Sequence, residues 1–168
     1  RGHLFKSNSD AEVIIHLYEE MGPSLVNKLN GMFSFAIHDE SKNLTLIARD
    51  RLGIKPLYYS VINDTFVFGS DLRIFNKFNV KINKNGIYSY LGLGYVPSPS
   101  TIYHNINKLT PGHYIEINYE DIGELEFSDF RPIKWWDPLT VSQSNCEFNI
   151  YDENYLIDEV HNILLRSV

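Results

Sequence analysis

Residues 32–50, MFSFAIHDESKNLTLIARD, contain two apolar runs separated by the polar turn DESKN. The second run alternates apolar side chains with others, which is the period of a β-strand. Two similar runs follow at 57–62 and 65–71, LYYSVI and TFVFGSD, with Asn63-Asp64 between them. Strands joined by short turns pair antiparallel, because a parallel pair needs a crossover of about a dozen residues or more. The stretch and its continuation therefore predict an antiparallel sheet of four strands.

Helices are predicted on both sides of these strands. In SNSDAEVIIHLYEEMG, residues 7–22, apolar side chains recur at helical spacing, and a Gly-Pro pair ends the pattern. Residues 84–94 form a second, weakly amphipathic helical pattern, and residues 112–130 suggest a final hairpin. A third helical pattern begins near residue 150 and continues to Val168.

The composition is that of a globular protein rich in aromatic residues. Of 168 residues, 43% are hydrophobic, 21% charged and 14% aromatic. The net charge of −6 argues against nucleic acid as a partner, because phosphate binding requires a basic face. No apolar run approaches the roughly 20 residues of a membrane span, so we expect no membrane partner. The single cysteine, Cys146, excludes an intramolecular disulfide and favours a cytoplasmic location.

Two neighbouring residues, Ser9 and Asp10, are both of the type that caps a helix. Ser9-Asp10-Ala11-Glu12 is typical of a capping box, in which the Ser9 side chain accepts the Glu12 amide and Glu12 reaches back to Ser9. Asp10 is then left at the first helical position. It either complements the helix dipole or binds the ammonium group of a ligand. Spacing alone favours the first interpretation.

The connection ARDRLGIKPLYY, residues 48–59, places three cations between two strands. An anion site is one interpretation, but the segment lacks the Gly-rich run and the following helix of a phosphate loop. We favour a fixed connection in which Gly53 makes a turn and Arg49 pairs with an acid.

The remaining candidates for chemistry are weak. The six histidines include no pair at the usual metal-ligand spacing, so no metal site is predicted. His16 and Glu12, four residues apart, are interpreted as a helix-surface pair. Cys146 has no basic neighbour within ten residues, so nothing local favours its thiolate and we do not expect a nucleophile.

Six stretches carry a family resemblance: SNSDAEVIIHLYEEMG, LNGMFSFAIHDE, LIARDRLGIKPLYYS, FVFGSDLRIF, YLGLGYVPSPSTIYHNINKLTPGHYIEI and WWD. Taken in order over residues 4–168, they resemble glutamine-hydrolysing asparagine synthetases. ARDRLGIKPLYY followed by GYVPSPSTI and KLTPGHY is the most specific combination.

The resemblance implies an α+β fold. Residues 1–137 would form the second part of a class II glutamine amidotransferase domain, an N-terminal-nucleophile hydrolase-like αββα sandwich of antiparallel sheets. Residues 138–151 would be a linker, and residues 152–168 the first helix of an α/β synthetase domain. Gly31 would allow close approach near the substrate pocket, and RDRLGIKP would brace the strands behind it.

The resemblance also implies an activity for the parent enzyme. In this family, hydrolysis of glutamine supplies ammonia, and the ammonia amidates aspartate that ATP and magnesium have activated. The nucleophile is an N-terminal cysteine, expected upstream of Arg1, so this chain would contain no catalytic residue. The loop that grips ATP would lie beyond Val168. We therefore expect no cofactor in this chain, ATP and magnesium in the parent, and no activity of the chain alone.

One family site residue falls within the chain. The aspartate of the family's SD.E motif contacts the α-ammonium group of bound glutamine, and Asp10 matches it. With the resemblance included, substrate binding becomes the favoured role of Asp10, while Ser9 caps the helix.

Two other functions stay open. One is an amidotransferase of the same family with a different acceptor, and the other is a non-catalytic module of the same fold used for binding or assembly. The chain begins at Arg1 rather than Met, and its last helical pattern runs to Val168, so we expect a longer parent. The edges and apolar faces of a partial sandwich predict a homodimer or other self-association.

Overall fold

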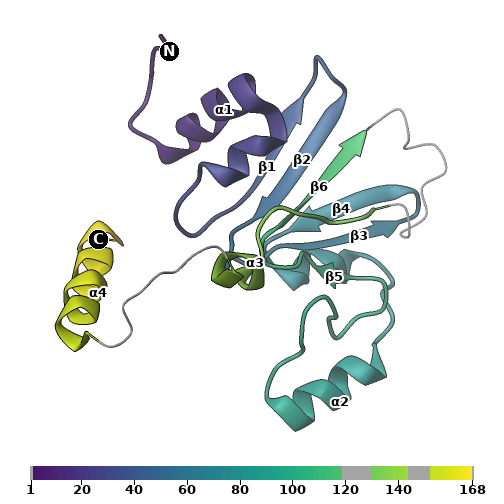
Figure 1. The fold of residues 1–168 in the computed structure, drawn as a ribbon. Helices are drawn as coiled ribbons and strands as arrows, with labels where there is room; N and C mark the ends of the chain where they lie inside the picture. The colour runs from purple at the N-terminus through teal and green to yellow at the C-terminus, as the bar shows by residue number, and fades with distance from the viewer. Residues whose placement is uncertain (1, 119–129, 144–151, 168) are drawn as a thin grey trace. The chain divides into compact units, whose positions relative to one another are not determined.

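The structure is a computed structural model that describes residues 2–118, 130–143 and 152–167 (Figure 1). The helices are α1 (Asp10–Met21), α2 (Lys84–Leu93), α3 (Pro138–Gln143) and α4 (Glu153–Ser167), with 3-10 helices at Gly22–Asn27 and Leu72–Lys77. The strands are β1 (Ser34–Asp39), β2 (Leu44–Arg49), β3 (Tyr58–Ile62), β4 (Thr65–Gly69), β5 (Asn107–Lys108), β6 (His113–Asn118) and β7 (Ile133–Lys134). The chain divides into two compact units, Arg1–Trp136 and Asp137–Val168.

The four predicted strands are present as β1 to β4, but they belong to two sheets rather than one. The sheets have the strand orders β1-β2-β6-β7 and β4-β3-β5, and every pair is antiparallel. The chain changes sheet between β2 and β3, where the connection 50–57 is too long for a hairpin turn. Asn63 and Asp64, with φ of 50° and 55°, do form a tight hairpin turn of the kind that matches strand twist. The predicted α+β fold with two antiparallel sheets is confirmed.

Strand β2 is buried on both faces and organises the first unit. Leu46 and Ala48 face a cluster with Tyr18, Leu25 and Val26, which come from α1 and the turn after it. Ile47 points the other way, into a cluster shared with β3 and β6: Leu57, Tyr59, Leu109, Ile115, Ile117 and Phe130. The first unit is therefore layered as helix, sheet and sheet, and Figure 1 shows α1 beside β1 and β2.

The start of α1 confirms Ser9 as the cap but not the predicted capping box. The Ser9 hydroxyl oxygen accepts the amide of Ala11 at 3.2 Å, rather than that of Glu12. The Glu12 carboxylate accepts the amides of Lys6 and Ser7, both at 2.7 Å. The difference arises because the segment before the cap folds over the helix start and presents these two amides to Glu12.

The second unit contains α3 and α4. Helix α3 forms in the first part of the segment predicted as a linker, and α4 matches the predicted helix at 152–168. Several apolar side chains of α4 are exposed, among them Leu164 at 61%. Cys146 and most of the second strand of the predicted final hairpin lie outside the described residues. The assignment of this unit to a synthetase domain stays a prediction.

No helix within the described ranges combines the length and apolarity that a membrane crossing requires.

Candidate functional site

Asp10, the predicted substrate ligand, is the first residue of α1 and is exposed. Ser9 already caps the helix, as the sequence predicts. In the described part of the chain, no side chain or amide hydrogen-bonds or pairs with the Asp10 carboxylate. The carboxylate is thus held at the start of a helix and, among the described residues, remains open to a ligand. Its role toward glutamine stays a prediction.

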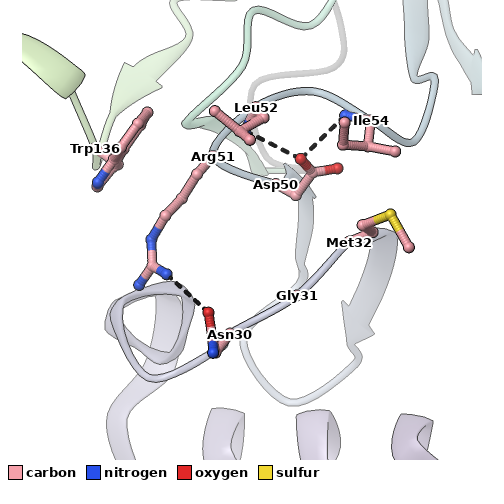
Figure 2. A pocket seen from close by; sticks show the side chains of 8 residues that line it. All are labelled: Asn30, Gly31, Met32, Asp50, Arg51, Leu52, Ile54 and Trp136. Atoms are coloured by element: carbon pink, nitrogen blue, oxygen red, sulfur yellow. Dashed lines mark hydrogen bonds between the residues drawn. The ribbon is translucent and has the colours of Figure 1, made fainter. Parts of the chain in front are cut away.

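A pocket of about 350 Å³ lies elsewhere in the first unit (Figure 2). It is lined by Asn30, Gly31, Met32, Asp50, Arg51, Leu52, Ile54 and Trp136. The pocket is built by the turn before β1, the segment after β2, and Trp136, two residues beyond the end of β7. Its volume suits a small ligand, and Asp10 is not among its lining residues.

Arg51 supplies positive charge at this pocket. Its Nη1 donates to Oδ1 of Asn30 at 3.4 Å, and its guanidinium carbon lies 5.7 Å from the centre of the Trp135 ring. The Nε of Arg51 is buried and finds no hydrogen-bond acceptor among the described residues. The walls are otherwise largely apolar, from Met32, Leu52 and Ile54. The arrangement can hold a small molecule with an anionic or hydrogen-bond-accepting group.

Asp50 lines the pocket but is committed to the backbone. Its carboxylate accepts the amides of Leu52 at 3.1 Å and of Ile54 and Lys55 at 3.0 Å, and the residue is only 1% exposed. Figure 2 shows two of these bonds. With its oxygens occupied in this way, Asp50 shapes the connection and is not a candidate general base.

Arg49 binds backbone carbonyl oxygens instead of the acid that the sequence predicts. Its guanidinium donates to three carbonyl oxygens, those of Lys55 at 2.7 Å and of Gly53 and Leu109 at 2.6 Å. Burial lowers the pKa of Arg49 from its ordinary value. Gly53 has a φ of +66°, and a Cβ there would lie 2.6 Å from Cγ of Pro111. The fixed connection is therefore confirmed, but backbone carbonyls replace the acid as its anchor.

Gly31 lines the pocket described above. Its φ is +130°, a conformation that side chains rarely adopt, so the glycine serves the backbone turn into β1. Among the described residues other than its chain neighbours, no atom lies within 4 Å of the position of a Cβ, and the expected close approach near the substrate pocket stays a prediction.

A cluster of His3, His16 and Glu19 was missed by sequence reasoning. Their potential ligand atoms all lie within 4.8 Å of one another. His3 lies in the segment before α1, and His16 lies on the helix. The two are too far apart in sequence to match a usual metal-ligand spacing. The one signal in the sequence was the pair His16 and Glu19, three apart on one helix.

Comparisons with known proteins agree on one family. The family described as glutamine amidotransferase domain matches residues 1–128. A putative glutamine-hydrolysing asparagine synthetase 2 of Methanocaldococcus jannaschii is 34% identical over 168 residues, which cover 97% of this chain and 30% of that protein. Asparagine synthetase 3 of Bacillus subtilis, also named as glutamine-hydrolysing, is 36% identical over 149 residues, covering 86% of this chain and 24% of that protein.

The fold is also found in a solved structure, a glutamine phosphoribosylpyrophosphate amidotransferase from B. subtilis, with a TM-score of 0.53. That likeness covers 80% of this chain and 24% of the other at 20% identity, so it concerns the fold alone. The chain spans 30% or less of the length of the two synthetases it matches. Because the family match extends over 1–128 and the relatives cover nearly all of the remainder, the chain belongs to the family of glutamine amidotransferase domains.

Proposed function

We propose that this chain is part of a glutamine-dependent asparagine synthetase. In the intact protein, hydrolysis of glutamine supplies ammonia for the ATP-dependent amidation of aspartate to asparagine. The observation that carries the proposal is the 34% identity, over 97% of this chain, to a relative named as a glutamine-hydrolysing asparagine synthetase. The nucleophile belongs to a part of the protein outside this chain, so the chain alone does not hydrolyse glutamine.

Asp10 binds the α-ammonium group of glutamine in this proposal. Its support is geometric: the carboxylate is exposed at the first position of α1, and Ser9 meets the need for a cap. A carboxylate facing an ammonium group makes a charge-assisted hydrogen bond of about 1.5–3 kcal/mol. The proposal also includes the use of ATP and magnesium by the synthetase part of the intact protein, and a cytoplasmic location.

The test is Asp10→Asn in the intact protein. The asparagine amide cannot attract the ammonium group as a charge does, so the KM for glutamine should rise by about tenfold or more. Synthesis with free ammonia should continue, because Asp10 touches only glutamine. An unchanged KM for glutamine would remove Asp10 from the site.

A matched control separates this effect from a general loss of charge. Asp64→Asn makes the same chemical change at an exposed hairpin turn, where φ is 55° and asparagine is equally suited. We expect this variant to keep the KM of the wild type. The acceptor is tested separately by supplying aspartate, ATP and magnesium, and absence of asparagine among the products would overturn the synthetase assignment.

A further inference from the structure

His3, His16 and Glu19 bring two imidazoles and a carboxylate to one point on the surface of α1. His3 comes from the segment before the helix, whereas the other two lie one turn apart on the helix itself. The two histidine rings are half-buried, with centres 4.4 Å apart, and Glu19 is exposed. The three ligand atoms converge within 4.8 Å.

The same type of ring nitrogen faces the carboxylate from both histidines. Nδ1 of His16 lies 3.1 Å from Oε2 of Glu19, and Nδ1 of His3 lies 3.6 Å from the same oxygen. Ligand atoms bound to one zinc ion at about 2.0–2.1 Å in a tetrahedron stand roughly 3.3 Å apart. The two observed separations lie on either side of that value, and the ligand atoms of all three residues lie within 4.8 Å of one another, so they are close enough to converge on one ion.

The opposite nitrogen of each ring faces a different carboxylate. Nε2 of His3 lies 2.9 Å from Oε1 of Glu20, and Nε2 of His16 lies 3.6 Å from Oε1 of Glu12. In metal sites the ring nitrogen that does not bind the ion usually donates its proton to such a carboxylate. Only His3 makes this contact at hydrogen-bond distance, whereas Nε2 of His16 is buried without a hydrogen-bond partner among the described residues. In both rings Nδ1 is the nitrogen that faces Glu19 and would bind the ion.

We propose that His3, His16 and Glu19 bind one divalent transition-metal ion, with Zn²⁺ as the best-suited class. Two imidazole nitrogens and a carboxylate oxygen form a ligand set that zinc accepts, and the fourth position is left to water. Glu20 acts as a positioning residue for His3, and Glu12 lies near the ring of His16. The carboxylates of Glu12, Glu19 and Glu20 also gather negative charge around the two imidazoles, which attracts a cation.

The proposed ion would join the segment before α1 to the helix. His3 lies on that segment, and Lys6 and Ser7 are already attached to the helix start through Glu12. An ion between His3, His16 and Glu19 adds a second attachment. This inference does not depend on the proposed function, because it concerns neither glutamine nor the synthesis of asparagine.

The test measures Zn²⁺ binding to the 168-residue chain by titration calorimetry, and Co²⁺ binding by visible absorption. We expect one ion per chain and the visible bands of low-coordinate Co²⁺. His3→Ala, His16→Ala and Glu19→Gln should each weaken binding by at least about tenfold, because each removes a ligand. Glu20→Gln should weaken it less, because the amide oxygen still accepts the proton of Nε2.

The control is His104→Ala, since His104 is exposed and stands outside the cluster. Its affinity for Zn²⁺ should equal that of the wild type. Circular dichroism checks that each variant keeps its fold, and Glu19→Gln, at an exposed position, leaves the core unchanged. The proposal is overturned if the wild type binds no stoichiometric ion, or if folded Glu19→Gln and His16→Ala bind as tightly as His104→Ala.

Discussion

Arg49 and Asp50 show how two adjacent charged residues can hold a connection without pairing with each other. Arg49 donates to three carbonyl oxygens, and Asp50 accepts three amides. These side chains thus bind backbone groups that a helix or a sheet would otherwise pair. Both residues are buried, at 8% and 1% exposure. Unpaired backbone groups inside a protein are costly, and these two side chains lower that cost between Leu52 and Lys55.

We expect Arg49→Met to destabilise the protein strongly. The change keeps an apolar stem of similar length but leaves the carbonyl oxygens of Lys55, Gly53 and Leu109 without this donor. The free energy of unfolding should fall by at least about 2 kcal/mol, measured by urea denaturation.

Arg73→Met is the matched control for Arg49. The Arg73 side chain is 86% exposed and pairs with Asp71 at the surface, where solvent weakens the interaction. Its loss should hardly change the free energy of unfolding. If the two arginine variants unfold at the same urea concentration, the carbonyl network does not anchor the connection.

At the scale of single elements, the start of α1 depends on an ionised Glu12. Its carboxylate accepts the amides of Lys6 and Ser7 and the hydroxyl of Ser7, which lowers the pKa of Glu12 from 4.5 to about 2. The hydroxyl of Ser7 makes the largest contribution to this shift. The folded protein therefore prefers the charged form more strongly than the unfolded chain does.

This preference predicts a pH dependence that Glu12→Gln removes. A pKa depressed by folding adds stability that is complete above the unfolded value of 4.5 and is lost as the pH falls toward 2. The wild type should be more stable than Glu12→Gln at neutral pH, and the difference should shrink through this window. Asp39, whose pKa is also lowered, acts equally in both proteins and cancels. A difference that stays constant from pH 7 to pH 2 would contradict the prediction.

Helix α2 contains two glycines with opposite surroundings. A Cβ at Gly86 would lie 2.4 Å from the carbonyl oxygen of Thr101, whereas a Cβ at Gly92 would meet no atom of another described segment within 4 Å. Gly86→Ala should therefore lower the free energy of unfolding by about 1–3 kcal/mol, because backbone must move. Gly92→Ala should raise it by up to about 1 kcal/mol through helix propensity. Thermal denaturation of both variants checks the signs, and two changes of the same sign would contradict the close packing of α2 on Thr101.

At the scale of the whole molecule, much apolar surface is left exposed. On and after α2, Tyr88 is 70%, Leu91 75% and Tyr95 60% exposed, and Leu52 at the pocket is 70% exposed. Burying such side chains between two copies of the chain would remove apolar surface from water, which favours association.

We therefore expect the chain to associate with copies of itself. Light scattering should give a mass above the 19.5 kDa of one chain, and Leu91→Glu should shift the distribution toward the monomer, because a charge at this exposed apolar position resists burial. Lys84→Glu also places a glutamate on α2, but at a position that is already charged and exposed, and should leave the mass unchanged. A monodisperse wild-type monomer would contradict this expectation.

The sequence by itself determined the local elements and the family. Alternation from Leu44 to Arg49, helical spacing from Val13 to Met21 and the Asn63-Asp64 turn are local patterns, and local geometry is what such patterns encode. The ordered motifs identified the family because a whole series of stretches is far more specific than any single one. A charged side chain, in contrast, can bind groups that are far away in the sequence, and a local pattern does not identify them. Arg49 could be predicted to anchor a loop, but its bond to Leu109 joins residues 60 positions apart.

Only the tertiary structure decided how these elements meet. It separated four consecutive strands into two sheets, because β2 has apolar residues on both faces and each face must be covered. It also built a pocket from the turn at 30–32, the connection at 50–54 and Trp136, and brought His3 to His16 and Glu19. Contacts between residues distant in sequence depend on chain paths that no local period records. Sites made from several segments therefore become visible only after folding.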